Sequence, residues 1–289
     1  MPPTRLLALT TLAMLAFAGN SLLCRSALQH TSIDASSFTV IRLISGALVL
    51  WLLVRLRAGR TTGQGNWGSA LALFAYAAGF SFAYVSLPAA TGALLLFGAV
   101  QASMIGVGLW RGERLRRWQI VGLVLALGGL LGLLFPGLSA PPLLGALLML
   151  GAGASWGVYS LRGKGAGDPT CVTAGNFARA VPMALVMGLL TLKHANLDMA
   201  GVAYAVASGA LTSGIGYAIW YTALPGLKAT QAATIQLSVP VIAALGGIAL
   251  LGEPLTLRLV LASIAILGGI ALVIRDGPGL RGQARDKPE

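Results

Sequence analysis

Long apolar stretches separated by short polar gaps follow one another along almost the whole chain. Each stretch holds roughly 20 residues, the length that a helix needs to cross a bilayer at a rise of about 1.5 Å per residue. Strands of a membrane barrel need only about half as many residues. The pattern therefore predicts ten membrane-spanning helices, at residues 6–24, 38–56, 68–86, 90–110, 118–135, 142–161, 171–190, 199–223, 229–251 and 256–274.

The first half of the chain recurs, weakly but in order, in the second half. With an offset of 137 residues, Arg25 recurs as Arg162. Further along, the offset becomes 140, and the motif Gly112-Glu113-x-Leu115 recurs as Gly252-Glu253-x-Leu255. The repeat predicts four parts, namely a first repeat (1–135), a linker (136–141), a second repeat (142–274) and a disordered tail (275–289).

Each repeat holds five predicted spans, and an odd number of crossings makes the second repeat enter the bilayer from the opposite side. The loops test this topology independently, because cytoplasmic loops carry an excess of Lys and Arg. With the N-terminus inside, 15 of the 20 Lys and Arg residues fall in inner segments, three in outer segments and two within spans. The sequence thus predicts an all-α integral membrane protein, built from two five-helix inverted-topology repeats, with both termini in the cytoplasm.

Composition supports a membrane protein and excludes several other classes. With 56% hydrophobic and 10% charged residues, the chain has too little polar material to cover a soluble globule. The net charge of +12 comes mainly from loop Lys and Arg residues, so it indicates membrane orientation and not nucleic-acid binding. The sequence contains no P-loop, no HExxH motif and no Cys/His cluster, so we expect no enzyme activity, no metal and no cofactor.

The start of the chain has a second interpretation, because Arg5 precedes an apolar run as in a secretory signal peptide. The first span is the repeat counterpart of the sixth, which cannot be a signal sequence, so we expect it to be retained. The predicted topology places Cys24 and Cys171 near opposite membrane faces. We therefore expect no disulfide between them.

Polar and aromatic side chains inside the spans are the candidates for a permeation path, because a polar group that faces lipid is costly. In the third and eighth spans they recur every four residues on one helical face, which suggests two walls of one central cavity. The candidate substrate-binding residues are Phe17, Asn20, Ser21, Tyr76, Phe80, Tyr84, Phe97, Gln101, Trp156, Tyr159, Ser213, Tyr217, Trp220, Tyr221, Thr234 and Ser238. The alternatives are lipid contact or core packing for the aromatic residues, and interhelical hydrogen bonds for Asn20 and Gln101.

Two arginines fall inside the predicted spans. Arg42 and Arg179 are repeat partners near the ends of the second and seventh spans. Snorkelling toward head groups or an interhelical hydrogen bond accounts for both, and contact with a substrate carboxylate is the alternative for Arg179. None of the eight acidic residues falls in the middle of a span. The sequence therefore predicts a cavity of neutral groups, without the buried acid that proton or cation antiport usually needs.

The junction between the fourth and fifth spans has the same Gly-Glu pair in both repeats. Gly112 and Gly252 are predicted to end a helix, and the glutamates that follow, Glu113 and Glu253, to cap the next one. Pro254 suits the first turn of that next helix. Substrate contact is the alternative role for the two glutamates.

Small residues predict where helices pack closely. Gly128-x-x-x-Gly132 has the spacing typical of helix contacts in lipid. The same spacing is common in apolar segments, so it does not indicate a dimer. The oligomeric state stays open, and a monomer is compatible with the sequence.

The repeated span pattern and its junction motifs resemble the EamA domains of the drug/metabolite transporter superfamily. The markers are the two Gly-Glu-x-Leu motifs, together with Leu127-Gly128-Gly129 and Leu267-Gly268-Gly269. Within this superfamily the chain is similar to bacterial exporters of aromatic and other amino acids. The resemblance implies that spans one, three, four, six, eight and nine surround the path. One departure is Val100, where the second repeat has Pro240, so the two halves need not bend alike.

These observations predict a secondary transporter of the bacterial inner membrane. It would export amino acids or similar small amphipathic metabolites by alternating access through a central aromatic-lined cavity, with the substrate and the lipid bilayer as its partners. The direction follows from the resemblance alone, so an importer, or an exporter of organic cations or drugs, stays an alternative. A non-transporting membrane scaffold is the alternative of another class, but it would not need polar groups on the inward faces of both repeats.

Overall fold

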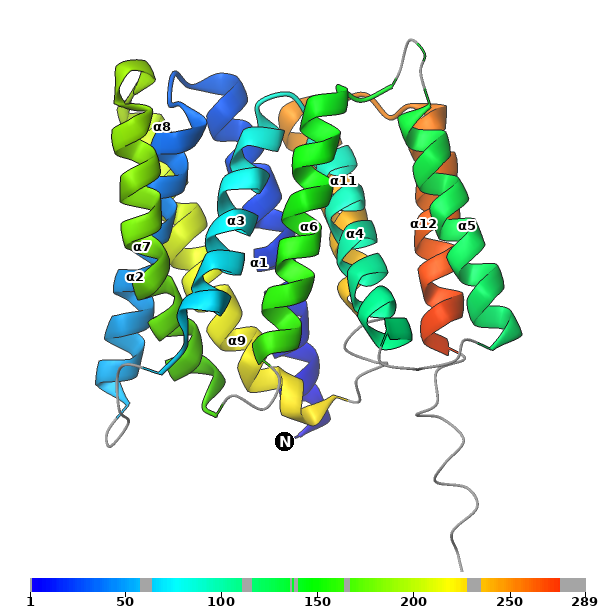
Figure 1. The fold of residues 1–289 in the computed structure, drawn as a ribbon, viewed down its shortest axis with the longest axis horizontal. Coiled ribbons are helices and arrows are strands. Elements are labelled where there is room, and N and C mark those ends of the chain that lie inside the picture. The colour runs from blue at the N-terminus through cyan, green and yellow to red at the C-terminus, as the bar shows by residue number, and fades with distance from the viewer. Residues whose placement is uncertain are drawn as a thin grey trace, which may run out of the picture.

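A computed structural model describes residues 2–57, 64–110, 116–135, 137, 140–163, 167–227 and 235–275. Every regular element within these ranges is a helix, and none of them is a strand. The long helices run side by side between two ends of a bundle (Figure 1). We call the end that holds the N-terminus the N face and the opposite end the far face. The predicted all-helical fold is confirmed for this part of the chain.

The helices follow the order of the predicted spans. The first half contains α1 (Pro3–His30), α2 (Ala35–Leu56), α3 (Trp67–Tyr84), α4 (Ala89–Trp110) and α5 (Arg117–Leu134). The second half contains α6 (Leu143–Gly163), α7 (Pro169–Leu190), η1 (Leu192–His194), α8 (Met199–Ala207), η2 (Ser208–Ile215), α9 (Gly216–Ala223), η3 (Leu224–Gly226), α11 (Ser238–Leu251) and α12 (Leu257–Arg275).

Eight described segments are long and apolar enough to cross a bilayer, judged by length and composition. One of them, Met199–Gly226, joins α8, η2, α9 and η3. The helices α3, with 18 residues, and α11, with 14 residues, lie at the positions of the predicted third and ninth spans. Each predicted span therefore overlaps a helical segment, although the first residues of the ninth span and the tail 276–289 lie outside the described ranges.

Local signals explain where several helices begin and end. The carboxylates of Asp34 and Asp198 accept backbone hydrogen bonds at the starts of α2 and α8. Hydrogen bonds from Gly201 N and from Ser32 hold the pKa of the Asp198 carboxyl below its ordinary value. Gly252 ends α11 as predicted, with a φ of 63° that favours glycine.

The junction after α11 differs from the prediction. Pro254 precedes α12 by three residues, since this helix begins only at Leu257. Glu253 does not cap α12 either, because its two carboxylate oxygens accept hydrogen bonds from Ala89 N at 2.9 and 2.8 Å. The glutamate thus caps α4, a helix of the other half, which tertiary packing brings to the end of α11. Residues 111–115 of the equivalent junction lie outside the described part.

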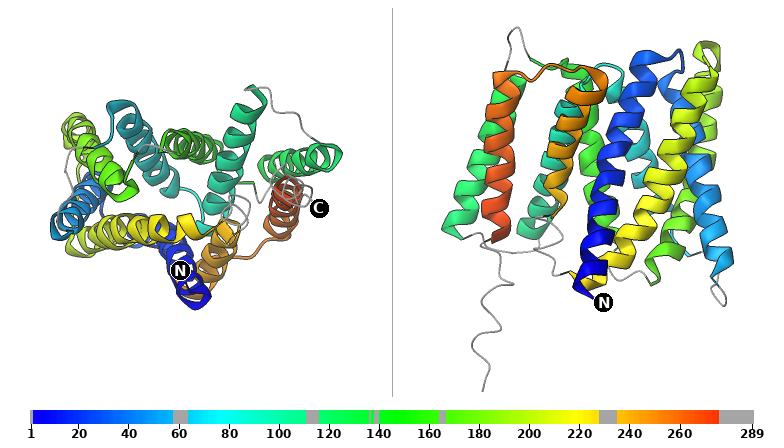
Figure 2. Two further views of the ribbon diagram at one scale, coloured as in Figure 1. Left: turned by 90° about the horizontal axis from the view of Figure 1, so that it is seen from below. Right: turned by 180° about the vertical axis from the view of Figure 1, so that it is seen from behind.

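The helices α5 and α12 lie side by side at one edge of the bundle (Figures 1 and 2). Their close contact depends on Gly122 and Gly129, where a Cβ would meet atoms of α12. A Cβ at Gly128 or Gly132 would meet no described atom within 4 Å, since both line an open apolar depression. The prediction that Gly128 and Gly132 form the packing face was therefore wrong. The glycines that face α12 are Gly122 and Gly129, which lie seven residues apart and not four.

The two halves of the chain interleave. α1 packs along α8, η2 and α9, and its repeat counterpart α6 packs along α3. In the same way, α11 contacts α1 and α4 contacts α6. The counterparts α2 and α7, α4 and α11, and α5 and α12 contact each other directly. Each half thus packs on the other, and the protein core lies between them.

The eighth predicted span is not one continuous α-helix. Residues Ser208–Ile215 form the π-helix η2 between α8 and α9. Here Gly209 lies so close to α2 that a Cβ would meet Arg42 O and Ser45 Oγ. A π-helical turn changes which side chains face inward, and such turns are frequent at functional sites. The register of Ser213 is therefore set by a local distortion that regular helical spacing did not predict.

Candidate functional site

Aromatic side chains from both halves form one connected series of ring contacts. We call this series the aromatic chain, and its members are Phe17, Tyr76, Phe80, Tyr84, Trp156, Tyr159, Phe177, Tyr217 and Trp220. The ring centroid of Phe80 lies 4.7 Å from that of Tyr84 and 5.5 Å from that of Tyr76. Trp156 joins the halves, 4.8 Å from Tyr76 and 5.1 Å from Tyr217. All eight ring contacts are edge-on or tilted, as aromatic quadrupoles favour.

The aromatic chain extends over most of the depth of the bundle. It begins with Tyr84, the last residue of α3 near the far face. It ends on α9, where Phe17 bridges Tyr217 and Trp220 with centroid distances of 5.7 and 6.0 Å. Five helices, α1, α3, α6, α7 and α9, contribute rings, so the chain runs along the interface of the two halves.

Eight of the predicted site residues belong to the aromatic chain, and sequence analysis missed one member. Phe177 of α7 lies 5.9 Å from Tyr217, centroid to centroid. Its position in the first repeat is Val40, so the repeat gave no signal for it. The sequence predicted a central cavity lined by aromatic side chains, and in this structure these rings contact one another.

A group of buried polar side chains adjoins the aromatic chain at Tyr76. We call it the polar centre, and its members are Asn20, Arg42, Tyr76, Ser208, Thr212 and Ser213. The amide of Asn20 donates to the Tyr76 hydroxyl at 3.3 Å and accepts from Ser208 Oγ at 2.7 Å. Thr212 Oγ1 donates to the same Asn20 oxygen at 3.2 Å. Asn20 therefore connects α1, α3 and η2. These are the interhelical hydrogen bonds that the sequence analysis gave as the alternative to substrate binding.

Arg42 is the charged member of the polar centre. Its side chain is 1% exposed and lies about 10 Å along α2 from the far-face end, at about 1.5 Å per residue. Nη2 donates to the Tyr76 hydroxyl at 3.2 Å, and Nε donates to Ser213 Oγ at 3.4 Å. The guanidinium carbon lies 5.3 Å from the ring centroid of Tyr76 and 4.8 Å from that of Phe80, within cation–π distance.

This position decides between the two predicted roles of Arg42 and corrects a second expectation. Arg42 does not snorkel toward head groups, because its guanidinium is enclosed by helices, and it makes the interhelical hydrogen bonds that were the other predicted role. The predicted site does not consist of neutral groups alone either, since a permanent cation lies at its centre. Sequence analysis also passed over Ser208 and Thr212, although their spacing of four residues places both on one helical face.

A second cluster lies at the far face, where α1, α3, α4 and α11 meet. The carboxylate of Glu253 accepts from Arg25 Nε at 3.3 Å as well as from Ala89 N. Arg25 Nη1 donates to the carbonyl oxygens of Tyr84 and Val85 at 3.0 and 3.1 Å. We call Arg25, Glu253 and Ala89 the far-face clasp, because it ties helices of both halves together.

At the N face, the repeat partners of Arg25 and Arg42 make different contacts. Arg162 donates to Asn66 Oδ1 at 3.0 Å and to Ser69 Oγ at 3.3 Å. Arg179 Nη1 donates to the carbonyl oxygens of Gln64 and Gly175 at 3.0 and 2.9 Å. Arg179 therefore joins α7 to the segment before α3, which is close to the interhelical hydrogen bond that was one of its three predicted roles.

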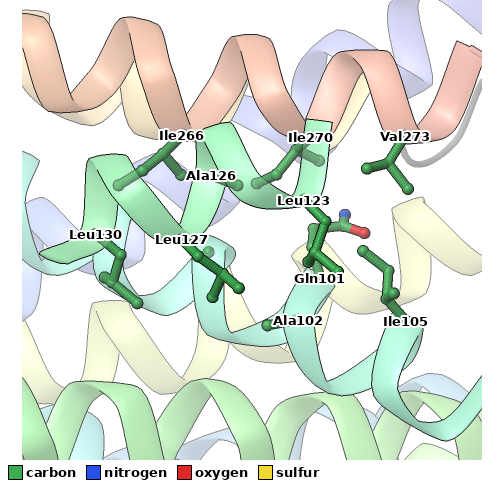
Figure 3. A pocket seen from close by; sticks show the side chains of 11 residues that line it. Gln101, Ala102, Ile105, Leu123, Ala126, Leu127, Leu130, Ile266, Ile270 and Val273 are labelled. Atoms are coloured by element: carbon green, nitrogen blue, oxygen red, sulfur yellow. The ribbon is translucent and has the colours of Figure 1, made fainter. Parts of the chain in front are cut away.

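Gln101 lies apart from the aromatic chain. It faces a cavity of about 20 Å³ between α4, α5 and α12, lined mostly by apolar side chains such as Leu123 and Ile270 (Figure 3). A larger cavity of about 350 Å³ lies at the far face and includes Glu253 and Thr91.

The remaining predicted residues have varied positions. Ser21 and Phe97 are buried, Tyr221 is half-buried, and Ser238 Oγ donates to Ile235 O at 2.7 Å. Thr234 lies outside the described residues. Across the described ranges, no group of three or more His, Cys, Asp or Glu side chains could hold a metal ion.

Comparison with known proteins identifies the family. Residues 143–275 match the model of the EamA-like transporter family. The uncharacterized protein PA1977 of Pseudomonas aeruginosa is 62% identical over 260 residues, which cover 90% of this chain and 91% of that protein.

Other relatives have a named activity. The threonine/homoserine exporter RhtA of Salmonella typhimurium is 38% identical over 146 residues, and that of Escherichia coli is 36% identical. Each of these alignments covers 48% of this chain and 48% of the exporter.

A solved structure shares the fold. One protein of known crystal structure superposes with a TM-score of 0.65 and 18% identity, over 94% of this chain and 96% of that one. The apolar helices and the family match together make the chain a multi-pass membrane protein. The resemblance seen in the junction motifs is thereby confirmed, and the chain belongs to the EamA-like transporter family of the drug/metabolite transporter superfamily.

Proposed function

We propose that this protein is a secondary transporter of the bacterial inner membrane that exports amino acids or similar small amphipathic metabolites. The aromatic chain with its adjoining polar centre is the observation that carries the proposal. It gives apolar contact and hydrogen-bonding groups at one place between the two halves, as a small amphipathic ligand requires. The similarity to threonine/homoserine exporters supports the substrate class and the direction.

Alternating access is the proposed mechanism. The contacts among the rings, most of them buried, and the far-face clasp suit a closed state, in which the substrate path is shut at the far face. Release of the clasp and separation of the halves along the aromatic chain would expose the polar centre. The contacts between the halves are equivalent in the two repeats, because α1 packs along the α8–η2–α9 segment just as α6 packs along α3. This equivalence supports ten spans in two inverted repeats.

The topology proposal places the N face in the cytoplasm. Among the described residues, Arg55, Arg57, Arg116 and Arg117 lie at the N-face ends of their helices, as the charge bias requires. We expect a reporter that is active only in the cytoplasm to be active after Glu289 and inactive after Leu138. Reporter assays in bacterial cells measure this directly, and the reverse pattern would overturn both the topology and the inverted repeat.

The rival functions fit the site less well. An exporter of organic cations would have to bring a positive charge to Arg42, which is already positive and lies in a medium that screens charge poorly. A scaffold without transport would not need six buried polar side chains between its halves. An importer of the same compounds would use the same site, so flux measurements in both directions must distinguish it.

Ion coupling is the second property that flux measurements test. The polar centre consists of a guanidinium with hydroxyl and amide groups, and none of its six members is a carboxylate or a histidine of the kind that usually exchanges protons. We therefore expect purified protein in liposomes to carry threonine or homoserine down its own gradient without a proton or sodium gradient. Counterflow and net flux, each with and without an ionophore, measure this. Strict dependence on an ion gradient would show that an acid from elsewhere in the chain reaches the path.

A further inference from the structure

The charge of Arg42 lacks a counter-ion among the described residues. The guanidinium is buried in the middle of the bundle, and its Nη1 has no hydrogen-bond partner within the described structure. Its other two nitrogens donate to neutral hydroxyl groups. A buried cation without an anion is costly in a membrane, so an arginine at this depth commonly indicates a function.

All four described acidic side chains make hydrogen bonds or an ion pair at helix ends. Asp34, Asp168 and Asp198 cap the starts of α2, α7 and α8. Glu253 belongs to the far-face clasp and pairs with Arg25. None of these four carboxylates contacts Arg42, so no described acid supplies its counter-ion and a ligand can.

We propose that Arg42 binds the carboxylate of the transported compound, so that substrates must carry one carboxylate. The proposal rests on the proposed transport function and names the substrate group that the site recognises. The free Nη1 of the guanidinium supplies the first hydrogen bond. The hydroxyl groups of Ser213 and Tyr76, both already beside the guanidinium, lie where they can donate to the same carboxylate. Planar guanidinium and carboxylate groups match in charge and geometry.

The surroundings of Arg42 define the rest of the ligand. One guanidinium balances one negative charge, which favours a monocarboxylate over a doubly charged phosphate ester. An ammonium group of the same ligand can lie against Trp156, since aromatic rings attract cations and the Arg42 guanidinium already lies over the Tyr76 ring. A neutral amino acid, with one carboxylate and one ammonium group, satisfies both requirements.

The first test compares a carboxylate with its amide. Counterflow in liposomes containing wild-type protein is measured for L-threonine and for L-threoninamide, which keeps the ammonium and the side chain. We expect threonine to be carried and the amide to be carried about ten-fold to a hundred-fold less, as loss of a charged hydrogen bond predicts. Equal transport of the two compounds would overturn the proposal without any variant being made.

The second test changes the arginine. Arg42→Met keeps the bulk of the side chain and removes the buried charge, so we expect the variant to fold with unchanged or higher thermal stability. Threonine counterflow should fall about ten-fold to a hundred-fold. Arg55→Gln is the matched control, because Arg55 lies on the same helix but is exposed, and its transport should equal that of the wild type. If Arg42→Met carries threonine normally, Arg42 is a packing residue held by cation–π contacts.

A third measurement separates this proposal from the proposed function. If wild-type protein carries no amino acid, the proposed function fails, and thermal protection of the detergent-purified protein then tests Arg42 alone. The probes are simple monocarboxylates, such as L-lactate, each compared with its amide. Protection by carboxylates in the wild type but not in Arg42→Met would support the site. Absence of protection by every carboxylate would overturn it. Should Arg42→Met not fold, Arg42→Lys, which keeps the charge but loses the planar group, replaces it.

Discussion

Replacement of Trp156 by alanine is expected to lower transport about ten-fold or more while the protein still folds. Trp156 contacts three rings, those of Tyr76, Tyr159 and Tyr217, and it joins the first half of the aromatic chain to the second. Each such ring contact contributes roughly 0.5–1.5 kcal/mol, and a ligand that replaces a ring contact gains a similar amount. Loss of the indole therefore removes binding surface at the junction of the two halves.

The matched control for this prediction is Trp118→Ala. Trp118 lies on α5 and is 63% exposed, so its side chain does not belong to the aromatic chain. Counterflow of threonine in liposomes, normalised to the amount of folded protein, measures both variants. Equal transport by wild type and Trp156→Ala would show that the aromatic chain is a packing core and that substrate passes elsewhere.

Replacement of Glu253 by alanine is expected to lower the free energy of unfolding by about 3–5 kcal/mol, the usual cost of removing one partner of a buried ion pair. The side chains of Arg25 and Glu253 are only 13% and 7% exposed. Without the carboxylate, Arg25 keeps a charge that water hardly reaches, and Ala89 N loses its acceptor at the start of α4. Thermal unfolding in detergent, with ligand absent, measures the loss.

Two further variants separate the ion pair from a general effect of charge. Lys193→Ala removes an exposed charge from the same face, and we expect its stability to stay within about 0.5 kcal/mol of the wild type. The double variant Arg25→Met, Glu253→Leu should recover part of the stability, because apolar side chains of similar size need no counter-ion. A Glu253→Ala protein as stable as the wild type would show that the far-face clasp does not hold the helices together.

Much of the fold could be predicted from the sequence. The lengths of the apolar runs predicted helical segments at the observed places, because a helix that faces lipid must satisfy its own backbone hydrogen bonds. The end of α11 at Gly252 was equally local, since a positive φ favours glycine whatever lies nearby. Eight members of the aromatic chain were predicted because the rings recur with helical spacing. These signals are local, since none extends beyond a single apolar run of about 20 residues.

Other features depended on which helices meet, and only the tertiary structure decided them. The partners of Glu253 and Asn20 lie 164 and 188 residues away along the chain, so no local pattern could indicate that Glu253 caps α4 or that Asn20 binds Ser208. The place of Arg42 depended on α3 and η2 enclosing the helix that carries it. The π-helix η2 arose where Gly209 let α2 approach. The sequence by itself therefore determined the helical segments, the end of α11 and the family, because these follow from local spacing and backbone chemistry. The tertiary structure determined which charges are buried and which side chains they meet, because burial and pairing depend on contacts between distant segments.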